Sequence, residues 1–182
     1  IRLLSDLHLE FSDRHPPFEP PDSGADVVVL AGDIDNGTRA IDWAERSFPR
    51  STVLYVAGNH EYYDGELAEV GAALAARAAR SANVRLLDNR ALVLDGVRFL
   101  GSTLWTDFEL FGGDNLHPAI ADALRYVVDF RAIRHGRALF TPEQSVLLHR
   151  QAVAWLEQAL AAPFPGATVV INTLDDPEAA DE

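Results

Sequence analysis

Residues 26–33 read Asp26-Val27-Val28-Val29-Leu30-Ala31-Gly32-Asp33, an apolar, β-branched run that stops at a glycine and a carboxylate. Such a run predicts a buried strand of a parallel sheet, here over residues 26–30. Two further apolar runs, residues 1–4 and 52–56, predict two more strands. The segments that follow the second and third of these strands predict helices, over residues 38–48 and 66–82. This alternation of strands and helices indicates a layered α/β fold.

The second half of the chain predicts a hairpin, two helices and a last strand. Asp95-Gly96 is a turn dipeptide between short strands at residues 91–94 and 97–100. The clearest helix covers residues 141–161, because Thr141 and Gln144 form a capping-box pair. The other expected segments are a glycine- and aromatic-rich loop over residues 102–115, a helix near residues 118–128 and a strand over residues 168–172. We expect a single domain over residues 1–182, because the sequence shows no repeat and no internal boundary.

Composition excludes several classes of function. The chain carries 15 Lys and Arg against 28 Asp and Glu, a formal net charge of −13, which opposes binding of nucleic acid and of anionic membranes. A small anionic substrate remains compatible if a metal ion reverses the charge locally. The sequence has no cysteine, so disulfides, thiolate metal sites and cysteine nucleophiles are excluded. No apolar stretch is long enough to span a membrane, and we expect a cytoplasmic protein whose oligomeric state the sequence leaves open.

Polar motifs follow three of the predicted strands. They are Asp6-Leu7-His8, Gly32-Asp33 and Gly58-Asn59-His60-Glu61. Asp6 and His8 are two residues apart, so in an extended chain their side chains point the same way. Ligands of α/β sheets bind beyond the carboxyl ends of the strands. Each motif alone is weak, but their repeated position after strands predicts one site for divalent metal ions such as Mn, Fe or Zn.

The three motifs resemble the signature of the calcineurin-like metallophosphoesterases, which is Asp-x-His, then Gly-Asp, then Gly-Asn-His-Asp/Glu. The resemblance covers the chain to Val170, and residues 101–105 are similar to the segment that follows in the family. It implies a layered α/β/β/α sandwich of the metallophosphoesterase type, C-terminally incomplete in this chain.

The resemblance also implies a role for each motif residue. Asp6 and His8 would hold a first metal ion, Asp33 would bridge two ions, and Asn59 would hold the second. In this family the two ions activate a water molecule that attacks phosphorus. His60 would protonate the leaving group or stabilise the phosphoryl group, so Asp33 and His60 are the expected catalytic residues. Asn59 and His60 are also expected to contact the substrate.

The sequence departs from the family pattern after about residue 171. The family continues with strand-end histidines and a Gly-His-x-His motif, whereas no histidine follows His149 here. Three family ligands are therefore missing, and we expect a domain that is truncated or altered after about residue 171. Asn172, Thr173 or Asp175 would be substitute oxygen ligands for Mg²⁺ or Mn²⁺, although a turn-like, solvated tail is favoured. We predict at most one well-occupied metal ion, bound by Asp6, His8 and Asp33.

Three further residues have two interpretations each, and a fourth, Asp35, has one. Trp105 is either part of the substrate-binding wall or part of a lid over the core. His149 fits the core-facing stripe of a helix better than a ligand position. Glu61 fits a carboxylate at a helix start better than a ligand. Asp35 is a candidate to orient His60.

The favoured function is a metal-dependent phosphoesterase, a hydrolase that cleaves a phosphomonoester or a small phosphodiester by metal-activated water. Its cofactors would be divalent ions among Mn, Fe, Zn and Mg. The missing ligands leave an alternative open, a catalytically impaired relative that binds a metal ion or a partner. A nuclease is disfavoured, because a net charge of −13 opposes a polyanionic substrate.

Overall fold

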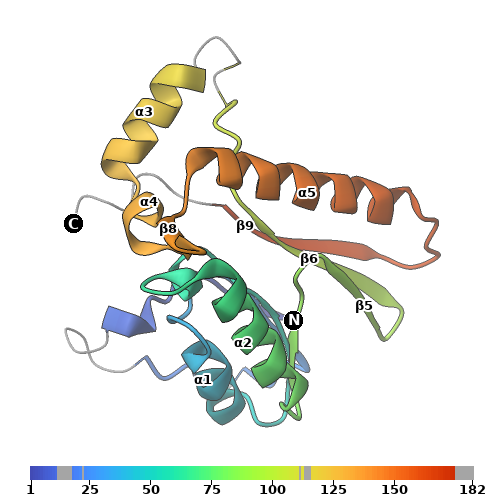
Figure 1. The fold of residues 1–182 in the computed structure, drawn as a ribbon. Helices are drawn as coiled ribbons and strands as arrows, with labels where there is room; N and C mark the ends of the chain where they lie inside the picture. The colour runs from blue at the N-terminus through green and yellow to red at the C-terminus, as the bar shows by residue number, and fades with distance from the viewer. Residues whose placement is uncertain (12–17, 22, 111, 113–115, 175–182) are drawn as a thin grey trace.

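The centre of the molecule is a pair of β-sheets packed face to face, with helices on the outer face of each sheet (Figure 1). The computed structural model describes residues 1–11, 18–21, 23–110, 112 and 116–174 of the chain. The layers follow the order helix, sheet, sheet, helix, which confirms the expected α/β/β/α sandwich.

The first sheet consists of four parallel strands in the order β1-β2-β3-β4. These strands span Arg2–Leu4, Val27–Ala31, Thr52–Val56 and Val84–Leu86. Helices α1 (Arg39–Ser47) and α2 (Leu67–Ala79) connect β2 to β3 and β3 to β4, and they cover the outer face. Because side chains alternate along a strand, Val28 and Leu30 pack toward the helices while Val29 packs toward the second sheet. The three strands expected in this half of the chain are all present.

The second sheet has three strands in the order β5-β6-β9. They span Arg90–Leu94, Val97–Leu104 and Thr168–Leu174. The expected turn joins β5 to β6, and Asp95 and Gly96 have the positive φ values that it requires, 47° and 77°. Strands β6 and β9 run beyond their expected ends at residues 100 and 172, because their parallel pairing continues to Leu104 and Leu174. The expectation of a turn-like tail from Asn172 was therefore wrong as far as Leu174.

Helix α5 (Pro142–Ala161) covers the outer face of the second sheet (Figure 1). Its predicted capping box is confirmed, because the Thr141 hydroxyl accepts from the Gln144 N–H and the Gln144 side chain accepts from the Thr141 N–H. Four short elements precede it: α3 (Leu116–Tyr126), α4 (Asp129–Ala132), β7 (Arg134–His135) and β8 (Ala138–Leu139). Helix α3 corresponds to the helix expected near residues 118–128.

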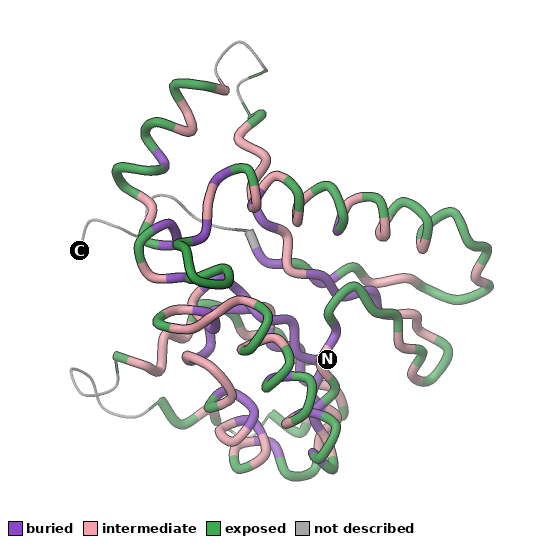
Figure 2. The backbone as a smooth tube through the Cα atoms, in the orientation of Figure 1, coloured by how far each residue is buried: buried purple, intermediate pink, exposed green. Residues whose placement is uncertain are grey.

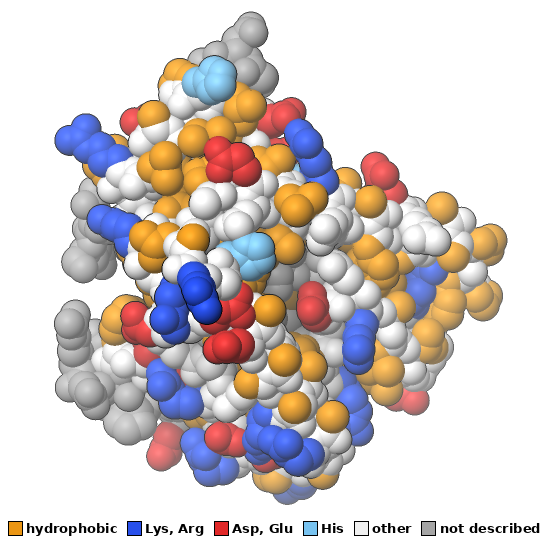
Figure 3. Space-filling view, in the orientation of Figure 1, with side chains coloured by type: hydrophobic (Ala, Val, Ile, Leu, Met, Phe, Trp, Pro, Cys, Tyr) orange, Lys and Arg blue, Asp and Glu red, His pale blue; other side chains and the backbone are white. Residues whose placement is uncertain are grey.

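Buried residues are concentrated in the strands and on the inner sides of the helices (Figure 2). The core between the two sheets includes Val29, Leu54, Val56, Phe99 and Ile171. On the face shown in Figure 3, basic and acidic side chains are mixed rather than gathered by sign. None of the described helices is long and apolar enough to cross a membrane.

The fold brings the ends of both sheets to one place. The loops that follow β1, β2 and β3 lie together because their strands are parallel neighbours. Near the end of β6, the Thr103 hydroxyl donates a hydrogen bond of 2.6 Å to the carbonyl of Ala57, just after β3. Near the end of β9, Thr173 packs against Gly32, where an added Cβ would lie 2.1 Å from the Thr173 Cγ2. The ends of β6 and β9 in the second sheet thus contact the loops that carry the second and third motifs.

Candidate metal centre

Backbone hydrogen bonds align the loops after β1 and β2. The N–H groups of Asp6 and His8 donate to the carbonyls of Gly32 and Asp33, at 3.1 and 3.0 Å, and Leu9 continues the pattern to Ile34 at 2.9 Å. The loop after β1 then forms a short 3-10 helix, η1 (Leu9–Phe11). The first two motifs are therefore held in register beyond the ends of their strands.

Three of the expected metal ligands form one cluster. Asp6, His8 and Asp33 each offer a ligand atom, and these atoms all lie within 4.8 Å of one another. All three residues have positive φ, at 52°, 46° and 53°, a backbone region that costs about 1–2 kcal/mol per residue for L side chains. Two carboxylates and an imidazole are a suitable donor set for a divalent ion of the Mn, Fe or Zn type. Their convergence, in spite of the backbone cost, fits the expected metal site.

Asp33 is the central carboxylate of this cluster. Its side chain is buried, and burial raises its pKa above the ordinary value even though the His60 N–H donates to its Oδ1 at 3.0 Å. A buried carboxylate of this kind is stabilised as an anion by a nearby cation. Gly58 lies against it so closely that an added Cβ would be 2.2 Å from the Asp33 Oδ1. The glycine of the third motif therefore makes room for the carboxylate of the second.

Asn59 is held by a carboxylate that sequence reasoning missed. The Asn59 Nδ2 donates to Oδ1 of Asp129 at 2.8 Å, and the Tyr63 hydroxyl donates to the same oxygen at 2.8 Å. Asp129 is 1 % exposed, and its Oδ2 has no hydrogen-bond partner within the described part of the chain. The bond from Nδ2 turns the carbonyl end of the Asn59 amide away from Asp129. Asp129 lies 70 residues after Asn59, and no local pattern in the sequence connects the two.

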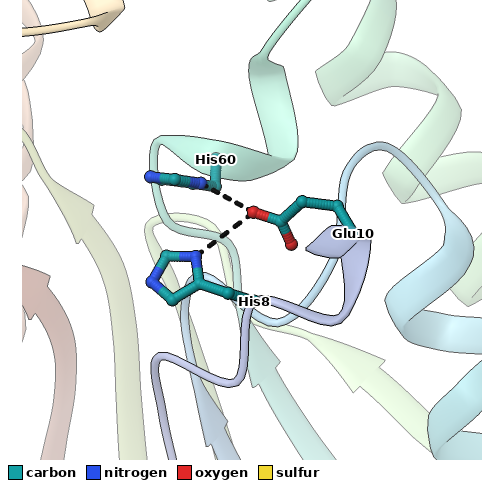
Figure 4. A group of neighbouring side chains, drawn as sticks. All are labelled: His8, Glu10 and His60. Carbon is teal, nitrogen blue, oxygen red and sulfur yellow. Dashed lines mark hydrogen bonds and ion pairs between the residues drawn. The ribbon is translucent and has the colours of Figure 1, made fainter. Parts of the chain in front are cut away.

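His60 and His8 share a second carboxylate that the sequence interpretation did not include, Glu10 (Figure 4). The Glu10 Oε1 lies 2.8 Å from His60 Nδ1 and 3.2 Å from His8 Nδ1. Burial by itself raises the pKa of Glu10, but the hydrogen bonds from His60 and His8 outweigh it and lower the pKa to about 2. The same carboxylate raises the pKa of His8. The sequence feature that could have identified Glu10 is its position two residues after His8, which itself lies two residues after Asp6.

Asp35 does not orient His60, and that expectation was wrong. Its Oδ1 accepts hydrogen bonds from Arg39 Nε at 2.8 Å and from the Asn36 N–H at 2.7 Å. Arg39 begins α1 four residues later, so Asp35 forms a local ion pair at the start of that helix. The carboxylate beside His60 comes from the loop after β1 instead.

Glu61 is neither a ligand in the cluster nor a simple helix-start carboxylate. It is fully buried within the 3-10 helix η2 (His60–Tyr62). Its two oxygens accept hydrogen bonds from three backbone N–H groups and one hydroxyl, those of Asp33, Ile34, Gly58 and Tyr55, at 3.2, 2.9, 2.7 and 2.8 Å. Burial and the charge of Asp33 raise its pKa to about 7. Glu61 therefore joins the loops after β2 and β3 through the interior.

Trp105 lies in the core. Its side chain is 6 % exposed and packs against Tyr62 and Phe140, with ring centroids 5.8 and 4.9 Å away. This packing supports the interpretation of a lid over the core more than that of a wall for substrate. His149 is half-buried and its Nδ1 is hydrogen-bonded to the Trp105 carbonyl, which agrees with a structural histidine on α5.

The end of β9 brings one of its three expected substitute ligands close to the site. Thr173 is buried against Gly32, directly before Asp33 in the chain. Asn172 is exposed and pairs in register with Ser102. Asp175 lies outside the described residues. In the described part of β9, the side chains are neutral.

Comparisons with known proteins agree with this geometry. A sequence model of the calcineurin-like phosphoesterases matches residues 1–172. Uncharacterized protein L509 of Acanthamoeba polyphaga mimivirus is 27 % identical over an alignment of 142 residues, and the match covers 67 % of this chain and 50 % of that protein. The chain thus matches about half the length of this relative. The crystal structure of the phosphopantetheinyl hydrolase from Mycobacterium tuberculosis has a TM-score of 0.70 at 20 % identity, covering 95 % of this chain and 67 % of that one.

Proposed function

This chain belongs to the calcineurin-like phosphoesterase family, and we propose that it is a metal-dependent phosphoesterase that hydrolyses a phosphomonoester or a small phosphodiester. The observation that supports this function most is the convergence of Asp6, His8 and Asp33, whose ligand atoms lie within 4.8 Å of one another beside His60. The family uses divalent metal ions, and this donor set suits them.

The residues of the site divide into those that would hold metal and those that would act on the ester. Asp6, His8 and Asp33 would hold a first ion, and Asp33 with Asn59 would hold a second. A divalent ion bound there supplies Lewis-acid activation of water and of a phosphoryl oxygen. Asn59 offers a neutral oxygen, so the site does not become too negative for an anionic substrate.

His60 would carry a proton to the leaving-group oxygen or donate a hydrogen bond to the phosphoryl group. Its Nδ1 is engaged by Glu10, so Nε2 is the nitrogen that would serve this purpose. Two aromatic rings contact the His60 ring, that of His8 with centroids 4.3 Å apart and that of Tyr63 with centroids 4.2 Å apart. When both of its ring nitrogens are protonated, a histidine fixed in this way can donate the Nε2 proton as a general acid without first reorienting.

A second candidate function is a relative that binds one metal ion or a partner without turnover. It is favoured by the neutral side chains at the described end of β9, which add no charged ligand beside Asp33 and Asn59. The first ion position has three charged or imidazole ligands, whereas the second has Asp33 and Asn59 alone among the residues assigned here. We expect at most one well-occupied ion in this 182-residue chain.

Hydrolysis by the purified chain distinguishes these candidates. The Mn²⁺-loaded protein should hydrolyse p-nitrophenyl phosphate or its bis ester, and a chelator should abolish the activity. The substrates tested also include a phosphopantetheinyl compound, because one structural neighbour is a phosphopantetheinyl hydrolase. His60→Asn should lower turnover more than metal content. Absence of hydrolysis on all substrates with Mn²⁺, Fe²⁺, Zn²⁺ and Mg²⁺, together with tight binding of one ion, would support the binding-only function.

A further inference from the structure

One carboxylate oxygen of the site faces two imidazole nitrogens. The Glu10 Oε1 lies between the Nδ1 atoms of His8 and His60, at 3.2 and 2.8 Å, and the Glu10 side chain is 8 % exposed (Figure 4). Glu10 follows His8 by two residues in η1, while His60 comes from η2, fifty positions away in the chain. The carboxylate therefore couples two of the three motif loops.

This contact determines which nitrogen of each ring carries the proton. An ionised carboxylate has only hydrogen-bond acceptors, so both Nδ1 atoms must be donors. A neutral histidine that is protonated at Nδ1 has its lone pair at Nε2. Figure 4 shows the second ring nitrogen of His8 and of His60 on the same side, away from Glu10. One carboxylate thus leaves the Nε2 atoms of both rings available for metal binding or proton transfer on that side.

The two histidines need a protonated Nδ1 and a free Nε2 for different reasons. His8 would bind metal together with Asp6 and Asp33, and a ligating imidazole is oriented by a carboxylate that accepts from its other nitrogen. His60 would deliver a proton or a hydrogen bond through Nε2, which requires a fixed ring that carries a second proton at Nε2 beside the one at Nδ1. In the described chain, the aromatic neighbours at 4.3 and 4.2 Å hold the His60 ring plane, and Glu10 fixes its rotation within that plane.

We propose that Glu10 is a positioning residue that keeps the Nδ1 of both His8 and His60 protonated. A single carboxylate then leaves the Nε2 of His8 free to bind metal and the Nε2 of His60 free to take up a proton and deliver it. This inference rests on the proposed function for the roles of the two histidines. The competing arrangement is a metal site made of His8, Glu10 and His60 themselves, since their ligand atoms also lie within 4.8 Å of one another.

The test is a long-range ¹⁵N–¹H correlation spectrum of the imidazoles in the full, metal-free chain, with the six histidines assigned by single His→Gln variants. We expect the neutral form of both His8 and His60 to be the Nδ1–H tautomer. Zn²⁺ should then shift the Nε2 of His8 and leave both Nδ1 atoms protonated. Nε2–H tautomers in the metal-free protein, or Zn²⁺ bound to the Nδ1 atoms, would overturn the proposal.

Variants of Glu10 extend the test. Glu10→Ala should mix the tautomers of both rings and weaken Zn²⁺ binding by roughly 10- to 100-fold. Glu10→Gln keeps one acceptor oxygen and should retain the tautomer of at least one ring, with a smaller loss of affinity. Glu69→Gln, an exposed carboxylate of α2, is the control and should change neither reading. If Glu10→Ala does not fold, the spectra of the wild type and of Glu10→Gln still show which ring nitrogen of His8 and of His60 is protonated.

The tautomer spectrum is independent of hydrolysis. Predicted tautomers without any phosphoesterase activity would refute the proposed function and support the orienting contact. Activity with Nε2–H tautomers would support the proposed function and overturn the role of Glu10.

Discussion

The loops after β1, β2 and β3 carry carboxylates and imidazoles, whereas the neighbouring ends of β6 and β9 carry only neutral side chains in the described part of the chain. The ligand loops use three residues with positive φ and are joined through the buried Glu61. The end of the second sheet makes simple contacts, such as the hydrogen bond from Thr103 to Ala57. The difference supports the proposal that the metal-binding and catalytic residues belong to the loops of the first sheet, while the second sheet packs against those loops.

The largest effect is expected at the carboxylate in the middle of the ligand loops. Asp33→Asn keeps the shape of the side chain but removes its charge, so activity should fall by roughly 10²- to 10³-fold or more and metal content should fall with it. Asp35→Asn is the control, because Asp35 lies two residues away and pairs with Arg39. Equal losses in both variants, measured as kcat/KM and as bound metal, would mean that the loop as a whole is responsible.

Stability should show the same contrast between the sheets. Glu61→Gln places an amide among four donors, so at least one buried donor loses its acceptor, at a cost of roughly 3 kcal/mol. Thr103→Val removes the hydrogen bond between the second sheet and the Ala57 carbonyl, and it should lower the free energy of unfolding by about 1 kcal/mol. Urea unfolding of the metal-free proteins measures both values. A Thr103→Val cost equal to that of Glu61→Gln would remove the distinction between the two regions.

Two glycines test how tightly the ligand loops are packed. Gly58→Ala would bring a Cβ to 2.2 Å from the Asp33 Oδ1 and 2.8 Å from its backbone nitrogen, so we expect a loss of about 1–3 kcal/mol and weaker metal binding. Gly96→Ala, in the β5–β6 turn, meets nothing within 4 Å and has a φ of 77°. It should cost about 1–2 kcal/mol and leave metal binding unchanged. Metal affinity separates these variants more clearly than stability does.

The smallest expected effect concerns pH. The pKa of Glu10 is about 2 in the folded protein, below its ordinary value of 4.5, so its contribution to stability is present above about pH 4.5 and is lost as the pH falls toward 2. The difference in Tm between wild type and Glu10→Gln should therefore shrink over that range. A difference that stays constant from pH 5 to pH 2 would show that the charge of Glu10 does not stabilise the fold.

Much of this architecture was predictable from the sequence because its signals are local. The β-branched runs, the Asp95-Gly96 turn and the Thr141–Gln144 capping box each involve residues close in sequence, and each element is present. The strand ends were harder to predict. The extension of β6 to Leu104 and of β9 to Leu174 depends on pairing between distant segments.

The site likewise contains residues that the sequence predicts and residues that it does not. Asp6, His8 and Asp33 were predictable, because parallel strands bring their carboxyl ends to one edge. Asp129 was not, since it approaches Asn59 only through the tertiary packing of α4. Glu61 was noticed as a helix-start carboxylate, but two of its four buried donors, the N–H groups of Asp33 and Ile34, belong to the loop after β2, which only the fold brings close to it.

Metal stoichiometry tests the central claim most directly. Titration of the metal-free 182-residue chain with Mn²⁺, followed by calorimetry and by elemental analysis after gel filtration, should give one tightly held ion per chain. Asp33→Asn should lose that ion. Two tightly held ions per chain, or one ion retained at full affinity in Asp33→Asn, would contradict a centre built on the first sheet around Asp6, His8 and Asp33.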